Sequence, residues 1–200
     1  AGHGTGHGTG LRPRERPHRG AGMTRLIHLN GAPGVGKSTL ARRYAVEHRG
    51  VLRCDIDELR TMIGGWQVDD EAAGRARTAA LAMVTGYLRT GHDVVLPQLV
   101  ARDDQLSRFV AAATDAGASH VHVMLTADPA TLVERFRDRH EDAVDDEWTR
   151  YTTAVLDRDG GDEAIRMWAE RLDALPALRV PSTDPETTYR DLLLALGEDL

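Results

Sequence analysis

A nine-residue stretch, residues 31–39, constrains the fold of this chain more than any other feature. It reads Gly31-Ala32-Pro33-Gly34-Val35-Gly36-Lys37-Ser38-Thr39 and fits the pattern G-x-x-x-x-G-K-[ST] between an apolar run and a predicted helix. Such glycines allow positive φ angles, so that backbone N–H groups and the dipole of the following helix surround an anion. The sequence therefore predicts a phosphate-binding loop (P-loop), the alternative being a glycine-rich turn that binds nothing.

The side chains of this loop indicate a nucleotide with a metal ion. Lys37 is the only lysine among the 25 lysines and arginines of the chain. Because lysine carries a compact, mobile ammonium and arginine a planar fork, the exception indicates a site that needs the narrower group. We predict that Lys37 reaches the β- and γ-phosphates of ATP and that the Ser38 hydroxyl binds Mg²⁺. All of residues 31–39 are expected to contact the nucleotide, and the choice between ATP and GTP stays open.

The rest of the chain alternates short apolar runs with longer amphipathic stretches, which is typical of βα units that build a parallel sheet. Five strands are predicted, near Leu26–Leu29, Val51–Cys54, Val94–Leu96, Val121–Leu125 and Leu178–Val180. Asp128-Pro129 and Asp184-Pro185 predict helix starts, since Asp caps a helix and Pro suits its first turn. The expected fold is an α/β P-loop NTPase with a five-stranded parallel sheet flanked by helices, and with ligands at the carboxyl ends of the strands.

Two carboxylates and an arginine follow the second predicted strand, in the run from Asp55 to Arg60. Phosphoryl transfer to an alcohol needs a carboxylate that orients the hydroxyl and accepts its proton. Asp57 is the candidate base; alternatively it only caps a short helix over Glu58–Ile63. Asp55 either holds Mg²⁺ through water or ends the strand in solvent. Arg60 either binds an anionic part of the acceptor or pairs with a neighbouring acid.

The third predicted strand ends in Pro97-Gln98, without the acid that many P-loop ATPases carry there as their Walker B carboxylate. This departure weakens a motor-ATPase interpretation and leaves the second magnesium contact open. Gln98 is a candidate contact to the acceptor, or an ordinary loop amide. A guanine-specific Asn-Lys-x-Asp motif is impossible with Lys37 as the only lysine, which disfavours a regulatory GTPase.

Three arginines alternate along the helix that is predicted to begin at Asp128. Arg135 and Arg139 are four residues apart and share a face of that helix, whereas Arg137 points elsewhere. The row is either a solvated basic face or a set of cations that bind phosphate.

Together these motifs resemble the small P-loop kinases of the nucleotide-kinase-like type, which include zeta toxins, chloramphenicol phosphotransferase, phage-type polynucleotide kinases and tunicamycin-resistance proteins. The resemblance rests on the P-loop and on Asp57-Glu58-Leu59-Arg60. For the tunicamycin-resistance proteins it extends to residues 94–98 and 132–139. It implies that Asp57 supplies the catalytic carboxylate and that Arg135 and Arg139 close over the phosphates as a lid. It also hints at antibiotic modification or self-resistance.

Composition limits the other classes of protein. Residues 1–22 are rich in Gly, His, Arg and Pro and predict a disordered leader or tag, followed by a single kinase domain over residues 23–200. A formal net charge of −6 disfavours broad nucleic-acid binding, and no apolar run approaches the ~18 residues of a membrane span. Cys54 is the only cysteine, so an internal disulfide is impossible and a reducing, cytoplasmic location is expected.

The leading hypothesis is an ATP- and Mg²⁺-dependent phosphotransferase that moves the γ-phosphate to a hydroxyl of a small molecule, with an antibiotic or related metabolite as one candidate. The second is a kinase for nucleotides or for polynucleotide 5′-hydroxyl groups. The third is a nucleotide-binding switch without transfer. The sequence leaves the acceptor and the oligomeric state open.

Overall fold

The computed structural model describes residues 23–142 and 146–199, so the leader predicted for residues 1–22 lies outside the described residues. Five strands form one parallel sheet in the order β2-β3-β1-β4-β5. Their bounds are Arg25–Asn30 (β1), Leu52–Arg53 (β2), Val94–Pro97 (β3), Ser119–Thr126 (β4) and Leu178–Pro181 (β5). Each predicted strand is present, and the predicted five-stranded parallel sheet is confirmed.

β1 is the central strand, and this position explains its uninterrupted burial. Leu26 pairs with Val94 of β3 on one side and with His120 of β4 on the other. All six residues of β1 are buried, as expected for a parallel strand that is covered on both faces. The loop that follows β1 therefore leaves the middle of the sheet at its carboxyl edge.

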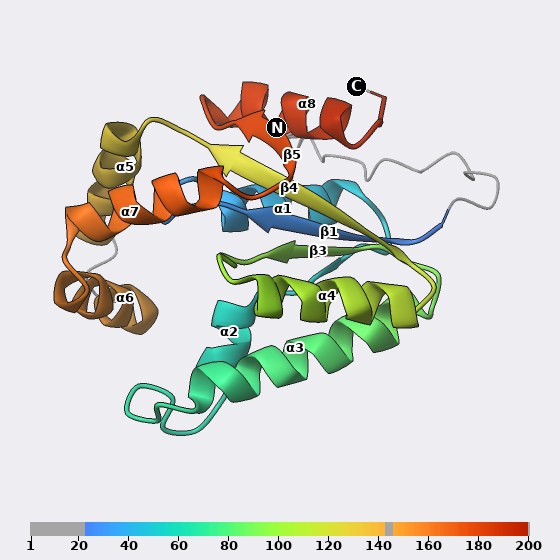
Figure 1. Cartoon of the computed structure of the whole chain (residues 1–200), viewed down its shortest axis with the longest axis horizontal. Helices are drawn as coiled ribbons and strands as arrows, with labels where there is room; N and C mark the ends of the chain where they lie inside the picture. Colours follow the sequence, from blue (N-terminus) through green and yellow to red (C-terminus); the bar gives the residue numbers. More distant parts are fainter. Residues whose placement is uncertain (1–22, 143–145, 200) are drawn as a thin grey trace, which may run out of the picture.

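Helices cover both faces of the sheet and extend past its carboxyl edge (Figure 1). α1 and α8 lie on one face and α3 and α4 on the other, while α2, α5, α6 and α7 lie at or beyond the carboxyl ends of the strands. The bounds are Lys37–Glu47 (α1), Ile56–Thr61 (α2), Ala72–Leu88 (α3), Asp103–Asp115 (α4), Pro129–Asp142 (α5), Glu147–Arg158 (α6), Asp162–Asp173 (α7) and Pro185–Ala195 (α8). Within the described residues, no helix combines the length and apolar character that crossing a membrane requires.

The sheet separates two hydrophobic cores, one on each of its faces, because successive side chains along a strand point to opposite faces. Ile27 and Leu29 pack with α1, α5, α7 and α8, whereas Leu26 packs with α3 and α4. Cys54 is fully buried in the second core, which raises the pKa of its thiol to about 12. Cys54 is therefore a packing residue.

The predicted helix starts at the two Asp-Pro pairs are confirmed. The Asp128 carboxylate accepts from the backbone N–H of Ala130 at 2.9 Å, and the Asp184 carboxylate accepts from two first-turn N–H groups of α8. Both helices thus begin directly after a strand, α5 after β4 and α8 after β5, and their first turns lie near the carboxyl edge.

A buried ionic network closes the opposite edge of the sheet. Arg25 at the start of β1 contacts Asp93 at 3.0 Å and also pairs with Glu198 beyond α8. Glu198 accepts from the Tyr44 hydroxyl at 2.7 Å and lies 2.9 Å from His48. The network joins α1, the central strand and the segment after α8.

Candidate active site

The loop after β1 has the backbone conformation that its glycines predict. Gly31, Gly34 and Gly36 have φ angles of 150°, 82° and 93°, values that favour glycine. A β-carbon at Gly34 would lie 2.4 Å from the backbone oxygen of Leu132 in α5. Gly36 caps α1 without a side-chain hydrogen bond, so the first N–H groups of that helix are available to an anion.

Lys37 is the first residue of α1, and its side chain reaches back to this loop. Its Nζ donates to the carbonyl oxygens of Gly31 and Ala32 at 2.8 and 3.0 Å. Burial lowers the pKa of the Lys37 ammonium to about 8, opposed by Asp57 and reinforced by Arg139. The ammonium is thus already surrounded by carbonyl oxygens and acidic neighbours at the place where phosphate oxygens are expected.

Asp55 lies at the end of β2 and is only 6% exposed. Burial and the neighbouring Glu58 raise the pKa of Asp55, while the hydrogen bond from the Asp57 backbone N–H, the charge of Arg53 and, last, the Ser38 hydroxyl lower it. The solvent-exposed alternative for this residue is therefore wrong. A carboxylate and a hydroxyl supply the hard oxygen ligands that Mg²⁺ prefers, so Ser38 and Asp55 are residues that would hold a magnesium ion.

The structure decides which aspartate caps α2. The helix begins at Ile56, and the Asp55 carboxylate accepts from the backbone N–H of Asp57. The predicted helix over Glu58–Ile63 is therefore wrong in its start, and so is the alternative that Asp57 is its cap. The helix begins two residues earlier than predicted, at Ile56, whose side chain is buried against α3 and α4.

The side chain of Asp57 lies in a strongly charged environment. Burial and Asp55 raise its pKa to about 6, and the positive charges of Lys37, Arg60 and Arg139 oppose that rise. A carboxyl group near pKa 6 beside three cations can accept a proton near neutral pH. These electrostatics suit a general base next to a phosphate site.

Arg60 binds an aromatic cluster, which neither of its predicted roles anticipated. One Nη donates to the hydroxyl of Tyr151 in α6 at 2.5 Å, and the guanidinium lies 4.6 Å from the centroid of that ring. Trp66 and Trp148 complete the cluster, with ring centroids 5.4 Å apart. Arg60 also interacts electrostatically with Asp57, so the aromatic cluster holds a cation whose charge acts on Asp57.

The three arginines of α5 have different partners. Arg139 interacts electrostatically with Lys37 and Asp57, at the mouth of the P-loop. Arg135 instead donates to Ser182 and to the carbonyl oxygen of Thr183, in the loop between β5 and α8. Arg137 pairs with Asp162 of α7. The structure thus brings Arg139 to the candidate catalytic residues and directs Arg135 to the neighbouring loop.

The remaining predicted residue, Gln98, lies partly buried after β3. Its backbone oxygen lies 2.9 Å from Nε2 of His28. Its side-chain amide oxygen has no hydrogen-bond partner among the described residues. Because buried amide oxygens normally accept a hydrogen bond, a bound ligand could supply the donor, and Gln98 stays a candidate contact for the acceptor.

Two residues that position the P-loop were not predicted. The Asn30 side chain accepts from the N–H of Gly31 and of Val100 at 2.8 and 3.1 Å, which joins the loop to the segment after β3. The Ser182 hydroxyl donates to the carbonyl oxygen of Val35 at 2.9 Å and accepts from Arg135. Asn30 could have been found from the sequence, because it is a polar residue at the end of an apolar strand. Ser182 could not, because its contacts are with residues far away in the sequence.

Comparisons with known proteins agree with this geometry. Residues 26–158 match the protein family described as AAA domain. No curated protein matches the chain. Among solved structures, the tunicamycin resistance protein of Deinococcus radiodurans is 18% identical with a TM-score of 0.60, over 88% of this chain and 98% of that one. A gluconokinase from Sinorhizobium meliloti is 18% identical with a TM-score of 0.55, over 88% and 93% of the two chains.

A third similar structure is a chain of an RNA repair complex, 22% identical with a TM-score of 0.59. The match covers 78% of this chain and 46% of that one, so the chain spans about half the length of this relative. At these identities the structures show a shared fold. The chain therefore belongs to the AAA domain family over residues 26–158 and has the P-loop fold of the nucleotide-kinase-like group.

Proposed function

We propose that this protein transfers the γ-phosphate of ATP to a hydroxyl group of a small molecule. The observation that carries the proposal is the electrostatic contact among Lys37, Asp57 and Arg139 at the mouth of the P-loop. In this proposal Asp57 is the base, and Lys37 and Arg139 are the two cations that balance the charge of a transferring phosphoryl group.

Each group has a defined task in this proposal. The loop backbone and Lys37 hold the phosphates, and Ser38 with Asp55 holds Mg²⁺, which neutralises phosphate charge when bound. Asp57 orients the acceptor hydroxyl and takes its proton as the new oxygen–phosphorus bond forms and the bond to ADP breaks. Arg139 stabilises the charge that spreads over the phosphoryl oxygens.

The direct test is acceptor-dependent release of ADP. A panel of antibiotics, nucleosides and sugars is incubated with the protein and Mg·ATP, and ADP is measured by a coupled assay. Antibiotics come first because the resemblance to tunicamycin-resistance proteins extends beyond the P-loop. A nucleotide-binding switch would bind ATP and show no acceptor-dependent release, and a kinase for 5′-hydroxyl ends would respond to oligonucleotides.

Lys37→Ala provides the control for nucleotide binding. Without the ammonium, turnover should be lost and ATP affinity should fall, because a direct phosphate contact has gone. Calorimetry that gives this variant the affinity of the wild type for ATP would contradict the proposed phosphate site.

A further inference from the structure

Asn30 ends the central strand with a side-chain amide whose orientation is fixed by its neighbours. The amide oxygen accepts from the backbone N–H groups of Gly31 and Val100, which can only donate. The amide nitrogen, a donor, therefore faces the other two neighbours, the backbone oxygen of Val100 at 2.7 Å and Nε2 of His122 at 3.1 Å. Because Asn30 is fully buried, no bulk water replaces a partner that it loses.

This orientation determines which nitrogen of His122 carries the proton. Since the Asn30 amide donates to Nε2, that nitrogen accepts and is unprotonated. Nδ1 lies 3.0 Å from the backbone oxygen of Pro176, which is an acceptor, so Nδ1 carries the proton and donates. Neutral His122 thus satisfies both neighbours. It connects β4 to the segment before β5 and to the end of β1.

A second proton on His122 breaks this arrangement. Both ring nitrogens of an imidazolium are donors, so Nε2–H would point at the N–H groups of the Asn30 amide. If that amide turned over, its oxygen would accept from the ring, but its nitrogen would then face the backbone N–H groups of Gly31 and Val100. Both of these residues are buried, so either orientation leaves buried donors without an acceptor, which costs free energy.

His122 belongs to a group of three imidazoles that stay neutral together. Its ring stacks on that of His28 in β1, with 5.1 Å between the centroids, and lies 5.9 Å from that of His120. Burial lowers the pKa of all three, for His28 to about 3 and for His120 to about 4. The hydrogen bond to Pro176 opposes this lowering of the pKa for His122, and the charge of Lys37 adds to it for His28.

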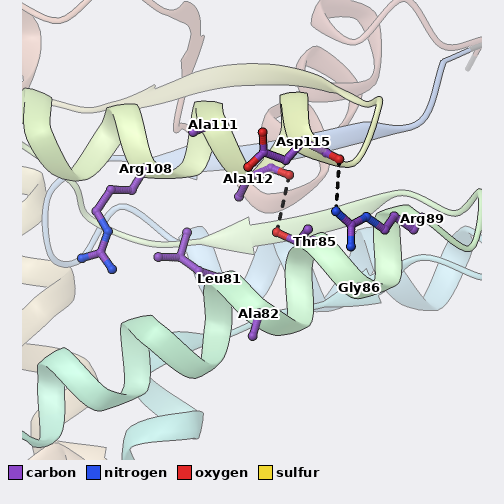
Figure 2. Close-up of a pocket in the computed structure, with 9 residues that line it drawn as sticks. All are labelled: Leu81, Ala82, Thr85, Gly86, Arg89, Arg108, Ala111, Ala112 and Asp115. Atoms are coloured by element: carbon purple, nitrogen blue, oxygen red, sulfur yellow. Dashed lines mark hydrogen bonds between the residues drawn. The ribbon is translucent and has the colours of Figure 1, made fainter.

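The charged side chains of the neighbouring elements do not compensate a second proton. Across residues 23–142 and 146–199, no carboxylate forms an ion pair or a hydrogen bond with the three rings. α4 packs Phe109 against His28. Charged residues of the elements beside the rings have other surroundings, namely Arg108 and Asp115 in the groove between α3 and α4 (Figure 2), and the pairs Arg102–Asp104 and Arg179–Asp173. Within this part of the chain, the proton therefore meets repulsion and no counter-charge.

Asn30 carries the effect to the phosphate loop. It holds the N–H of Gly31, the first residue of that loop, and the carbonyl oxygen of Gly31 in turn accepts from Nζ of Lys37 at 2.8 Å. We infer that His122 is a positioning residue for this loop: its neutral ring fixes Asn30 and thereby Gly31 for ATP binding, and a second proton on the ring releases them. The inference rests on the proposed function in that the loop binds ATP.

The direction of the pH effect follows from the environment of the ring. Because burial lowers the pKa of His122 in the folded chain, the contribution of its neutral form is complete above the ordinary pKa of ~6.5. That contribution is lost as pH falls below this value. Acid should therefore weaken ATP binding.

The first test follows the link without nucleotide. NMR records the imidazole nitrogens of His122 and the side-chain NH₂ group of Asn30 between about pH 7.5 and 5, the range in which histidine titrates. Both sets of signals should move with one midpoint, because one proton acts on both. In His122→Gln the Asn30 signals should stay constant, since Gln offers an acceptor oxygen in place of Nε2 that does not protonate in this range. Wild-type Asn30 signals that do not follow the titration of His122 would overturn the inference.

The second test measures ATP affinity by calorimetry at about pH 7.5 and 5.5. At the lower pH, the dissociation constant of the wild type should rise by roughly 2–10-fold more than that of His122→Gln, the scale of one lost hydrogen bond. Protonation of ATP itself affects both proteins equally. His122→Phe keeps an aromatic ring without an acceptor, and it should bind ATP more weakly than the wild type at the higher pH. His120→Gln is the matched control on β4 and should keep the wild-type pH dependence, because Nε2 of His120 has no hydrogen-bond partner among the described residues.

The outcomes separate the two proposals. Equal pH dependence in the wild type and His122→Gln would overturn the inference, and so would wild-type affinity of His122→Phe at the higher pH. A wild type that binds no ATP at either pH would contradict the proposed function, and the NMR titration would still decide whether His122 controls Asn30. Circular dichroism of each protein at each pH verifies that the fold is intact.

Discussion

The Asp55 carboxylate accepts a hydrogen bond from the backbone N–H of Asp57, with 3.1 Å between oxygen and nitrogen. Asp55 thereby caps α2, and the side chain of Asp57 stays beside Lys37 and Arg139. Two aspartates two residues apart thus have separate tasks, and Asp57 can be changed without disturbing the start of the helix.

Asp57→Asn should lower acceptor phosphorylation by ~10²–10⁴-fold, the usual scale of general base catalysis, because an amide cannot accept the proton of an alcohol. ATP affinity should stay within about twofold of the wild type by calorimetry, since the loop and Lys37 are intact. Glu58→Gln is the matched control, because Glu58 is the next acid and is exposed. Transfer at the wild-type rate by Asp57→Asn would exclude Asp57 as the base.

The pH dependence should report the ionisation of Asp57. Burial and Asp55 raise its pKa to about 6, so kcat/KM should rise with pH up to about 6 and level off above it. The effect on stability has the opposite sign. The folded pKa exceeds the unfolded value of ~3.9, so the contribution of Asp57 to stability is present below that value and is lost as pH rises through about 6. Thermal melts of the wild type and Asp57→Asn between pH 4 and 7 measure this loss.

Magnesium binding should depend on Ser38 and Asp55 together. Ser38→Ala removes the hydroxyl, and Asp55→Asn keeps a capping oxygen for α2 while it removes the charge. Each variant should need ~10–100-fold more Mg²⁺ for half-maximal ATP binding. Thr78→Ala, an exposed position on α3 outside the nucleotide-binding loop, is the control, and equal magnesium requirements in all four proteins would rule out this site.

Arg139→Ala should lower kcat by roughly 10²-fold or more, in the range of lost electrostatic stabilisation of a transition state. Its melting temperature should stay near that of the wild type, because the side chain is exposed. Arg137→Ala is the control on the same helix, since Arg137 pairs with Asp162 away from the site, and its kcat should not change. Equal kcat values for the two variants would show that Arg139 has no catalytic role and belongs to a solvated basic face.

Glu198→Gln should destabilise the fold by about 3–5 kcal/mol, the usual loss when one partner of a buried ion pair is removed. Hydrogen bonds from His48, Arg25 and Tyr44 hold the pKa of Glu198 well below its usual range, despite the opposing effect of burial. A lowered folded pKa stabilises the protein above the unfolded pKa of ~4.3, and this stability is lost as pH falls. Urea unfolding at pH 7 and pH 4 should show a larger difference between the two proteins at pH 7.

Much of the fold could be predicted because its signals are local. Each of the five strands is a short apolar run. The pairs Asp128-Pro129 and Asp184-Pro185 each start a helix by local interactions, since the Asp caps the first turn that the Pro begins. The start of α2 could not be predicted, since Asp55 and Asp57 are equally good caps by residue type. The burial of Ile56 decides between them, and burial is a property of the folded chain.

The candidate site was predictable where the motif is contiguous and less so where distant segments meet. Helical spacing places Arg135 and Arg139 on one face of α5, but the β5–α8 loop binds Arg135, 47 residues away from Ser182 in sequence. Arg60 likewise contacts Tyr151 across 91 residues. Such partners depend on tertiary packing, so residue spacing alone does not reveal them.

The contact between Gly34 and Leu132 limits how α5 can move relative to the phosphate loop. Because a β-carbon at Gly34 would lie 2.4 Å from the Leu132 oxygen, the first two turns of α5 touch the phosphate loop without an intervening side chain. A motion that preserves this contact cannot swing α5 from its beginning as a rigid rod. Any bend that keeps the contact would then lie beyond Leu132 and Phe136, whose backbone atoms are nearest to a β-carbon at Gly34, and would carry only the distal part of the helix, with Arg139.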